Sequence, residues 1–287
     1  MASQSASVND FTGAVLAWGV PRLRDLPWRR TREPWAVLVS EVMLQQTQVA
    51  RVIPRWEAFL VRFPTAAVCA AAPLGDVLSE WQGLGYPRRA RSLHATARRV
   101  TELGYFPHDL AGLLALPGVG PYTARALLAF AFELDAAVVD TNIARVYARV
   151  AGERLTPGRV QAIADDACPA DASWAWNQCL MDLGAVLCRP AAPACEECPV
   201  RSMCAWEGSG RPDPAIGSSG VSGRQARFEG SDRQARGRLM KALTAGPGDR
   251  SSVAEIMQRD AAVAERLVHD LTTEGLCATT PTTVTLP

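Results

Sequence analysis

The sequence has no long hydrophobic run. Its apolar stretches are short and interrupted by arginine, and its first residues, MASQSASVND, lack the basic start and apolar core of a signal peptide. These absences argue against a membrane-spanning or secreted protein. The 287 residues, of which 48% are hydrophobic and 21% charged, fit a globular protein with one large or two smaller domains. We expect it in the cytoplasm.

Lysine is almost absent, since Lys241 is the only one in the chain. The formal net charge is only +1, so the overall composition predicts no polyanionic partner. The distribution of positive charge along the chain is more informative, because residues 85–100, GYPRRARSLHATARRV, contain five arginines and no acid. Such a strip can neutralise phosphates, although a charged run on its own is more often a solvated helix face.

An alternating strand pattern is missing from residues 10–205, where apolar residues instead recur at spacings of three and four. This periodicity predicts an all-α fold of helices joined by short loops. Residues 207–231 are rich in glycine, serine and proline and predict a linker. Residues 232–287 predict two or three amphipathic helices and then a Thr/Val-rich hairpin, the order of a small winged-helix-like module.

Disulfides are not expected in the cytoplasm, so the eight cysteines are predicted to be thiols or metal ligands. Four of them fall within 17 residues in the order C-x6-C-x2-C-x5-C: Cys188, Cys195, Cys198 and Cys204. Four thiolates can hold an iron–sulfur cluster, and a tetrahedral zinc site is the alternative. The single C-x2-C pair with wide outer spacings favours iron–sulfur, because zinc ribbons usually use two such pairs.

The segment LPGVGPYTARA contains a glycine-rich turn before a helix. Gly118 and Gly120 permit positive φ angles, and Pro121 fits the first helical turn. The backbone N–H groups of such a turn can bind a phosphate. Taken alone, G-x-G is more often a simple helix cap.

Asp140 follows the apolar run AAVV and precedes another helix. Its simplest role is that of an N-cap, which contributes about 1 kcal/mol. A carboxylate at a helix N-terminus is also favoured in its ionised form, and an ionised carboxylate can stabilise a positively charged transition state.

Glu41 lies in the stretch SEVMLQQTQV, which reads as a mostly buried helix beginning at Pro34. On this helix Glu41, Gln45 and Gln48 are expected at i, i+4 and i+7 on one polar face. A carboxyl among amides and apolar side chains tends to stay protonated and can donate a proton. Together with an ionised Asp140 it would form the two-carboxylate arrangement that cleaves glycosidic bonds.

The motifs LPWRR, SEVMLQQTQVARVIPRWEAFLVRFPT, WQGLGYPRRARSLH, LPGVGPYTARA, VVDTNIARVYAR and WNQCLMDLGAVLC, with the cysteine quartet, resemble the MutY-type A/G-specific adenine DNA glycosylases of the helix-hairpin-helix superfamily. The resemblance covers about residues 10–206. It implies a six-helix barrel domain (residues 29–136), an iron–sulfur domain (residues 1–28 and 137–206), a 4Fe-4S cluster, and removal of adenine opposite guanine or 8-oxoguanine. The expected partner is mismatched double-stranded DNA, and the expected state is a monomer associated with the nucleoid.

The resemblance also assigns roles to individual residues. In catalysis, Glu41 would protonate adenine at N7 and Asp140 would stabilise the sugar cation, with Tyr122 and Asn142 beside them. Contacts to the bases would come from Arg29, Gln45 and Gln178 near the adenine and from Tyr86 as a wedge beside the opposite base. Contacts to the DNA backbone are expected from Gly118, Gly120, Arg88 and Arg89.

Three features depart from the family pattern. Pro87 stands where many members have a second aromatic residue, and Thr141 replaces a common glycine. The C-terminal tail is also too short for the Nudix-like domain that reads 8-oxoguanine in longer members, so preference for 8-oxoguanine over guanine is open.

Two other functions remain alternatives. One is a pyrimidine-directed relative, such as a thymine mismatch glycosylase or an endonuclease III-like lyase. A lyase needs an amine at the hairpin. This chain has Tyr122 there, and its sole lysine is far from the hairpin in sequence. The other is a non-catalytic DNA-binding or redox-sensing iron–sulfur protein, against which the pair Glu41 and Asp140 argues.

Overall fold

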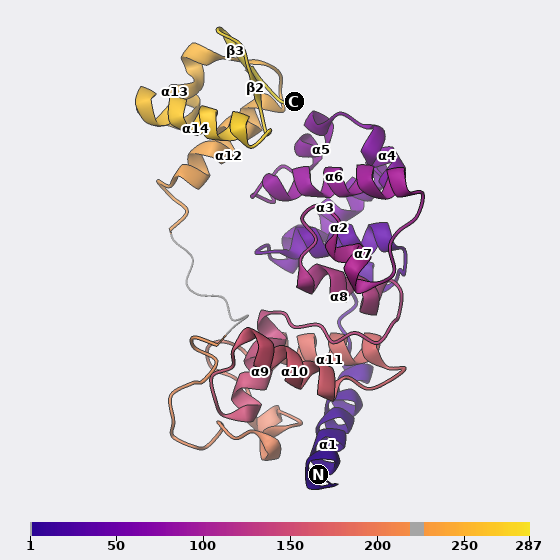
Figure 1. The fold of residues 1–287 in the computed structure, drawn as a ribbon. Coiled ribbons are helices and arrows are strands. Elements are labelled where there is room, and N and C mark those ends of the chain that lie inside the picture. Colours follow the sequence, from indigo (N-terminus) through magenta and orange to yellow (C-terminus); the bar gives the residue numbers. More distant parts are fainter. Residues whose placement is uncertain (1, 219–226) are drawn as a thin grey trace. The chain divides into compact units, whose positions relative to one another are not determined.

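The computed structural model describes residues 2–218 and 227–287, with side chains described from residue 10 onwards. Its described residues are mainly helical, as predicted, and form two compact units (Figure 1). Unit 1 comprises residues 2–34, 108–110 and 120–218, and unit 2 comprises residues 35–107, 111–119 and 227–287. Residues 219–226 of the predicted linker lie outside the described ranges. Among the described helices, none has both the length and the apolar character needed to span a membrane.

Unit 1 is centred on α11 (Ser173–Val186), which packs against both α1 (Ala2–Gly19) and α9 (Thr141–Ala151). Its core is apolar and includes Phe11, whose ring meets that of Trp176 edge to face at 5.7 Å. The apolar residues of α9 face this core because they recur with helical spacing. The remaining helices of the unit are η1 (Val20–Arg22), η2 (Pro27–Arg29), α8 (Pro121–Phe130), α10 (Pro157–Ala167), η3 (Cys195–Glu197) and η4 (Arg201–Met203).

Unit 2 contains a group of helices around an aromatic core, in which Phe59 packs against Trp35, Phe63 and Trp81. The longest of these helices, α6, carries the arginine strip. The helices of this group are α2 (Pro34–Leu44), α3 (Val49–Arg62), α4 (Ala66–Ala71), α5 (Leu74–Glu80), α6 (Arg88–Leu103) and α7 (Leu110–Leu114).

The helix that carries Glu41 is shorter than predicted. α2 ends at Leu44, Gln46 adopts a left-handed φ of 56°, and Gln48 is the N-cap of α3. The prediction that Glu41, Gln45 and Gln48 share one face of a continuous helix is therefore wrong. Only Glu41 belongs to α2.

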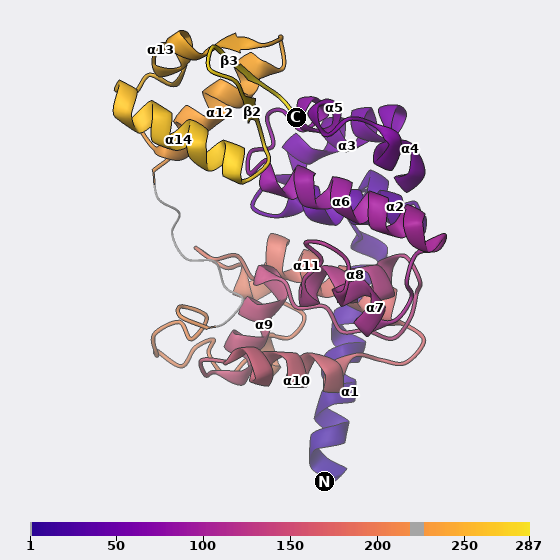
Figure 2. The ribbon, with the colours of Figure 1, turned by 45° about the horizontal axis from the view of Figure 1, so that its top comes forward.

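The C-terminal module of unit 2 has the predicted winged-helix-like order. Helices α12 (Asp232–Leu243), α13 (Val253–Met257) and α14 (Ala261–Thr273) precede a hairpin of β2 (Ala278–Thr279) and β3 (Thr283–Thr285) (Figures 1 and 2). A strand that the sequence did not predict, β1 (Gly248–Asp249), pairs antiparallel with β3, which gives the sheet order β1-β3-β2.

Candidate active site

Asp140 is the N-cap of α9, as predicted. Its Oδ1 accepts a hydrogen bond from the backbone N–H of Ile143 at 2.7 Å, and the side-chain amide of Asn142 donates to Oδ2 at 3.0 Å. Although its side chain keeps some accessible surface, burial raises the pKa of Asp140, and the donors at Ile143 and Asn142 with the charge of Arg145 lower it only in part. The ionised form therefore depends on these donors.

Arg145 contacts Asn142, and the sequence analysis did not single it out. Its Nη2 donates to the Asn142 Oδ1 at 2.8 Å and to the backbone oxygen of Gly184 at 2.6 Å. Because Arg145 occupies the amide oxygen, the amide nitrogen of Asn142 is the atom that faces Asp140. No sequence signal distinguishes this arginine from its neighbours.

Gly184 allows α11 to approach α9 closely. A Cβ at this position would lie 2.6 Å from the Cβ of Asn142 and 2.9 Å from its backbone oxygen. A larger residue would push away the segment that carries Asn142. The sequence analysis did not single out Gly184, although a glycine within a helical pattern is a signal of close packing.

Glu41 is surrounded by buried residues. All nine residues from Trp35 to Met43 are buried, and Glu41, the only charged one among them, is 5% exposed. A carboxyl held within a packed apolar helix is the environment expected of a proton donor. Glu41 lies in unit 2 and Asp140 in unit 1.

Four of the predicted residues line one pocket of unit 2: Gln45, Arg88, Arg89 and Gly118. The Gly118 turn packs tightly onto α6, because a Cβ at Gly118 would lie 2.5 Å from that of Ser92. Gly118 also has a φ of 74°, as predicted. The prediction of positive φ is wrong for Gly120, whose φ of −92° and ψ of 177° are extended.

The helix after this turn begins as predicted. Gly120 is the N-cap of α8, Pro121 is its first residue, and Tyr122 follows as a half-buried side chain. Pro121 lacks the N–H that the first turn would leave unpaired, so it fits this position without loss.

Tyr86 lies in a strained loop, with a φ of 49° after Gly85 with a φ of 70°. Arg89 supports this loop by donating to the backbone oxygens of Leu84 at 2.9 Å and Gly85 at 3.1 Å. The same guanidinium donates to three backbone oxygens at the end of α2, those of Val42, Met43 and Gln45.

This hydrogen bonding gives Arg89 a structural role within unit 2. Burial lowers its pKa to about 10. Contact with the DNA backbone stays a prediction for Arg89. Its neighbour Arg88 is more available, with a side chain that is 66% exposed and an ion pair to Glu274 at 2.6 Å.

Arg29 forms a bidentate ion pair with Asp182, in which both N–H···O distances are 2.8 Å. The Nε of Arg24 donates to the same carboxylate at 2.7 Å. Burial alone would raise the pKa of Asp182, but the hydrogen bonds and charges of these arginines keep it below its usual range. Gln178 is buried on α11, one turn before Asp182. The sequence analysis missed Asp182, which anchors Arg29 beside this face of α11.

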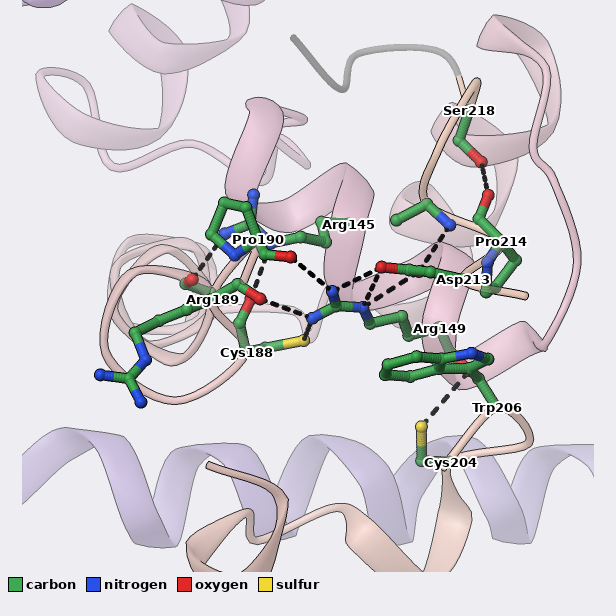
Figure 3. A network of polar contacts seen from close by, with 12 residues as sticks. Arg145, Arg149, Cys188, Arg189, Pro190, Cys204, Trp206, Asp213, Pro214 and Ser218 are labelled. Atoms are coloured by element: carbon green, nitrogen blue, oxygen red, sulfur yellow. Dashed lines mark hydrogen bonds and ion pairs between the residues drawn. The ribbon is translucent and has the colours of Figure 1, made fainter. Parts of the chain in front are cut away.

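The four predicted ligands, Cys188, Cys195, Cys198 and Cys204, line one cavity of unit 1. Arg149, which is 2% exposed, donates to the Cys188 sulfur at 3.3 Å and to the backbone oxygen of Arg189 at 2.8 Å. Figure 3 shows its guanidinium between this segment and Asp213, to which Nη2 donates at 2.6 Å. Burial raises the pKa of Cys188, whereas Arg149 favours its thiolate.

The four cysteines offer soft sulfur donors to this cavity, which suits iron–sulfur or zinc chemistry. Within the described part of the chain, no three His, Cys, Asp or Glu side chains form a group able to hold a single metal ion.

Known proteins resemble this chain in sequence and in structure. The model of the HhH-GPD superfamily of base excision DNA repair proteins matches residues 39–170. An adenine DNA glycosylase of Mycolicibacterium smegmatis is 40% identical, over 91% of this chain and 90% of its own length. A thermostable thymine-DNA glycosylase structure has a TM-score of 0.66 at 28% identity, covering 71% of this chain and 98% of that one. A trapped endonuclease III–DNA covalent intermediate has a TM-score of 0.60 at 24% identity and covers 67% of this chain and 91% of that one.

Proposed function

The chain belongs to the adenine DNA glycosylase family, in the HhH-GPD superfamily, and we propose that it hydrolyses the N-glycosidic bond of adenine mispaired with guanine or 8-oxoguanine. The observation that carries this proposal is the N-terminus of α9. Its helix dipole, the Ile143 N–H and the Asn142 amide all favour a negative charge on Asp140. This arrangement suits stabilisation of a positively charged sugar.

The reaction assigns opposite tasks to the two carboxyl groups. Glu41 donates a proton to N7 of adenine as the N-glycosidic bond breaks, and the electron pair of that bond leaves with the base. The carboxylate of Asp140 stabilises the resulting oxocarbenium-like sugar. Water then adds its hydroxyl group to the sugar and releases a proton, so the products are adenine and an abasic strand.

Recognition of the base requires adenine to leave the duplex, because its reactive atoms are stacked and paired inside it. Extrusion costs less from a mismatch than from a Watson–Crick pair, which gives a source of selectivity. We propose that Arg29, Gln45 and Gln178 each contact the extruded adenine. We propose that the arginine strip, including Arg88, and the hairpin turn contact the DNA backbone. Tyr86 would lie beside the base opposite adenine.

We assign a 4Fe-4S cluster to the cysteine quartet. The observation that supports it is that the four cysteines line one cavity, with a spacing that favours an iron–sulfur cluster over a zinc ribbon. When bound, the cluster would tie the loop after α11 to the helices of an iron–sulfur domain formed by residues 1–28 and 137–206. The barrel domain would be residues 29–136. Catalysis by Glu41 and Asp140 does not pass through the cluster.

One base-release experiment tests the function. The purified enzyme is incubated with duplexes containing adenine opposite guanine, adenine opposite 8-oxoguanine, thymine opposite guanine, or an oxidised pyrimidine. Free bases are measured, and strand breaks are measured with and without alkali. We expect adenine from the first two duplexes and breaks only after alkali. Release of thymine or of the oxidised pyrimidine alone would favour a pyrimidine-directed enzyme. Light scattering of the same preparation tests the expected monomer.

A further inference from the structure

The C-terminal module contacts the loop that carries Tyr86. Nη1 of Arg233, on α12, donates to the phenol oxygen of Tyr86 at 2.7 Å. The Arg233 guanidinium also lies 5.6 Å from the centre of the Tyr86 ring and 5.2 Å from that of Phe228. These contacts restrict the guanidinium, so Arg233 holds both the phenol group and the ring of Tyr86.

Tyr86 needs such support because its backbone is strained. A φ of 49° is uncommon for a residue with a Cβ, and it persists only where the surroundings hold it. Arg89 supports the loop from the side of α6, with its guanidinium 5.5 Å from the ring centre. Arg233 supports it from the side of the C-terminal module.

Glu274, just after α14, anchors the module to α6. Its carboxylate pairs with Arg88 at 2.6 Å and with Arg236 of the module, and its backbone oxygen accepts a hydrogen bond from Arg91. Glu274 is 9% exposed, and although burial raises its pKa, Arg88 and Arg236 lower it to about 2. The anchor is therefore ionised throughout the neutral range.

Helix α14 of the module has no excess of basic residues. A helix that reads DNA is usually basic, but α14 carries two acids, Glu265 and Asp270, and one arginine, Arg266.

We propose that the C-terminal module is a specificity element and that Arg233 is a positioning residue, which holds Tyr86 in the orientation needed beside the base opposite adenine. This inference rests on the proposed function, in which Tyr86 contacts that base. It assigns the small tail a role in discriminating mismatched from matched adenine. Glu274 keeps the module docked.

The test measures single-turnover adenine release from A opposite G and from A opposite T in the full-length protein. We expect Arg233→Ala to lower the ratio of the A·G rate to the A·T rate by about tenfold. A change of this size lies within the range of interaction energies measured between residues in direct contact. Arg233→Lys, which keeps the charge and a donor, should restore part of the ratio. Tyr86→Phe, which removes only the hydroxyl group, should lower it too, and the double variant should lose less than the product of the two single losses.

Arg250→Ala is the matched control. Arg250 also lies in the module, but it pairs with Glu265 at 2.8 Å and should leave the ratio unchanged. Thermal unfolding of each variant shows that the fold is retained. A normal ratio in Arg233→Ala, independent effects of the two substitutions, or an equal loss in Arg250→Ala would overturn the inference. Failure of the wild-type protein to release adenine would instead overturn the proposed function.

Discussion

The two carboxyl groups assigned to catalysis lie in contrasting surroundings. Asp140 stands at a helix N-terminus and accepts hydrogen bonds from Ile143 and Asn142, whereas Glu41 lies inside a helix whose neighbouring residues are all buried. The first site is made by backbone geometry and nearby polar groups. The second lies among the buried residues of α2. The contrast lies in the local structure around each group, because a helix N-terminus favours the charged form of a carboxyl whereas burial disfavours it.

Removing either carboxyl group should have the largest effect. Asp140→Asn and Glu41→Gln are each expected to slow adenine release by about a hundredfold to ten-thousandfold, because a positioned acid or base typically contributes that much. Mismatch binding, measured by gel shift, should change little, since both substitutions conserve shape. Near-normal turnover in either variant would remove that residue from the mechanism.

Loss of a cluster ligand should affect binding rather than chemistry. Mutating a hydrogen-bond partner of a metal ligand typically lowers metal affinity by about tenfold to hundredfold. Cys198→Ser removes a proposed ligand itself, so we expect at least that loss. Iron analysis and DNA affinity should fall together, while the rate at saturating enzyme falls much less. The wild-type protein should be brown and contain iron, and a colourless, fully active protein with one zinc ion per chain would contradict the cluster.

The hydrogen bond from Asn142 should be visible in the pH profile. In the proposed mechanism Asp140 acts as a carboxylate, so activity should fall as pH drops through its pKa, and burial places this loss at a higher pH than for an ordinary aspartate. Asn142→Ala removes a donor that lowers the pKa, so the acid limb should move further upward. At neutral pH we expect about a tenfold loss, the scale of a hydrogen bond to a charged group. An acid limb that stays in place would argue against this role.

Gly184→Ala tests the packing beneath Asn142. The added Cβ would meet Asn142 at 2.6 Å, so we expect a loss of about 1–3 kcal/mol in unfolding free energy and a severalfold slower adenine release. Gly13→Ala in α1 is the control, because a Cβ at Gly13 meets nothing within 4 Å. Denaturant unfolding measures both variants. Equal stability of the two would show that α9 and α11 are not tightly packed here.

Lys241→Ala should have no effect. A lyase cuts DNA through a Schiff base with an amine, which the Tyr122 phenol cannot form, and Lys241 is an exposed residue of α12. Borohydride should therefore trap almost no protein on DNA with either the wild type or the variant. Efficient trapping of the wild type would refute a glycosylase without lyase activity.

Local features of the site could be predicted from the sequence. The capping role of Asp140 depends on residues within one helical turn, and Pro121 begins α8 because its own ring fits that position. The winged-helix-like tail was also readable, since each of its helices has a clear apolar periodicity.

Features that depend on distant partners could not be predicted. α2 ends earlier than predicted, at the point where the guanidinium of Arg89, more than 40 residues away in sequence, donates hydrogen bonds to the backbone oxygens at its C-terminus. The pairing of Arg29 with Asp182 spans 153 residues, and β1 becomes a strand only by pairing with β3 near the C-terminus. Periodicity in one segment carries no information about such contacts.

The position of Arg149 has a consequence for chain entropy. Its single guanidinium binds the backbone oxygen of Pro190 at 3.3 Å and the carboxylate of Asp213, so it joins the two ends of the segment that holds Cys195, Cys198 and Cys204. A loop whose ends are already joined has fewer conformations to lose. In forming the proposed cluster, these cysteines would therefore belong to a loop that is already closed, and Arg149 of α9 would lower the entropy cost of bringing them together.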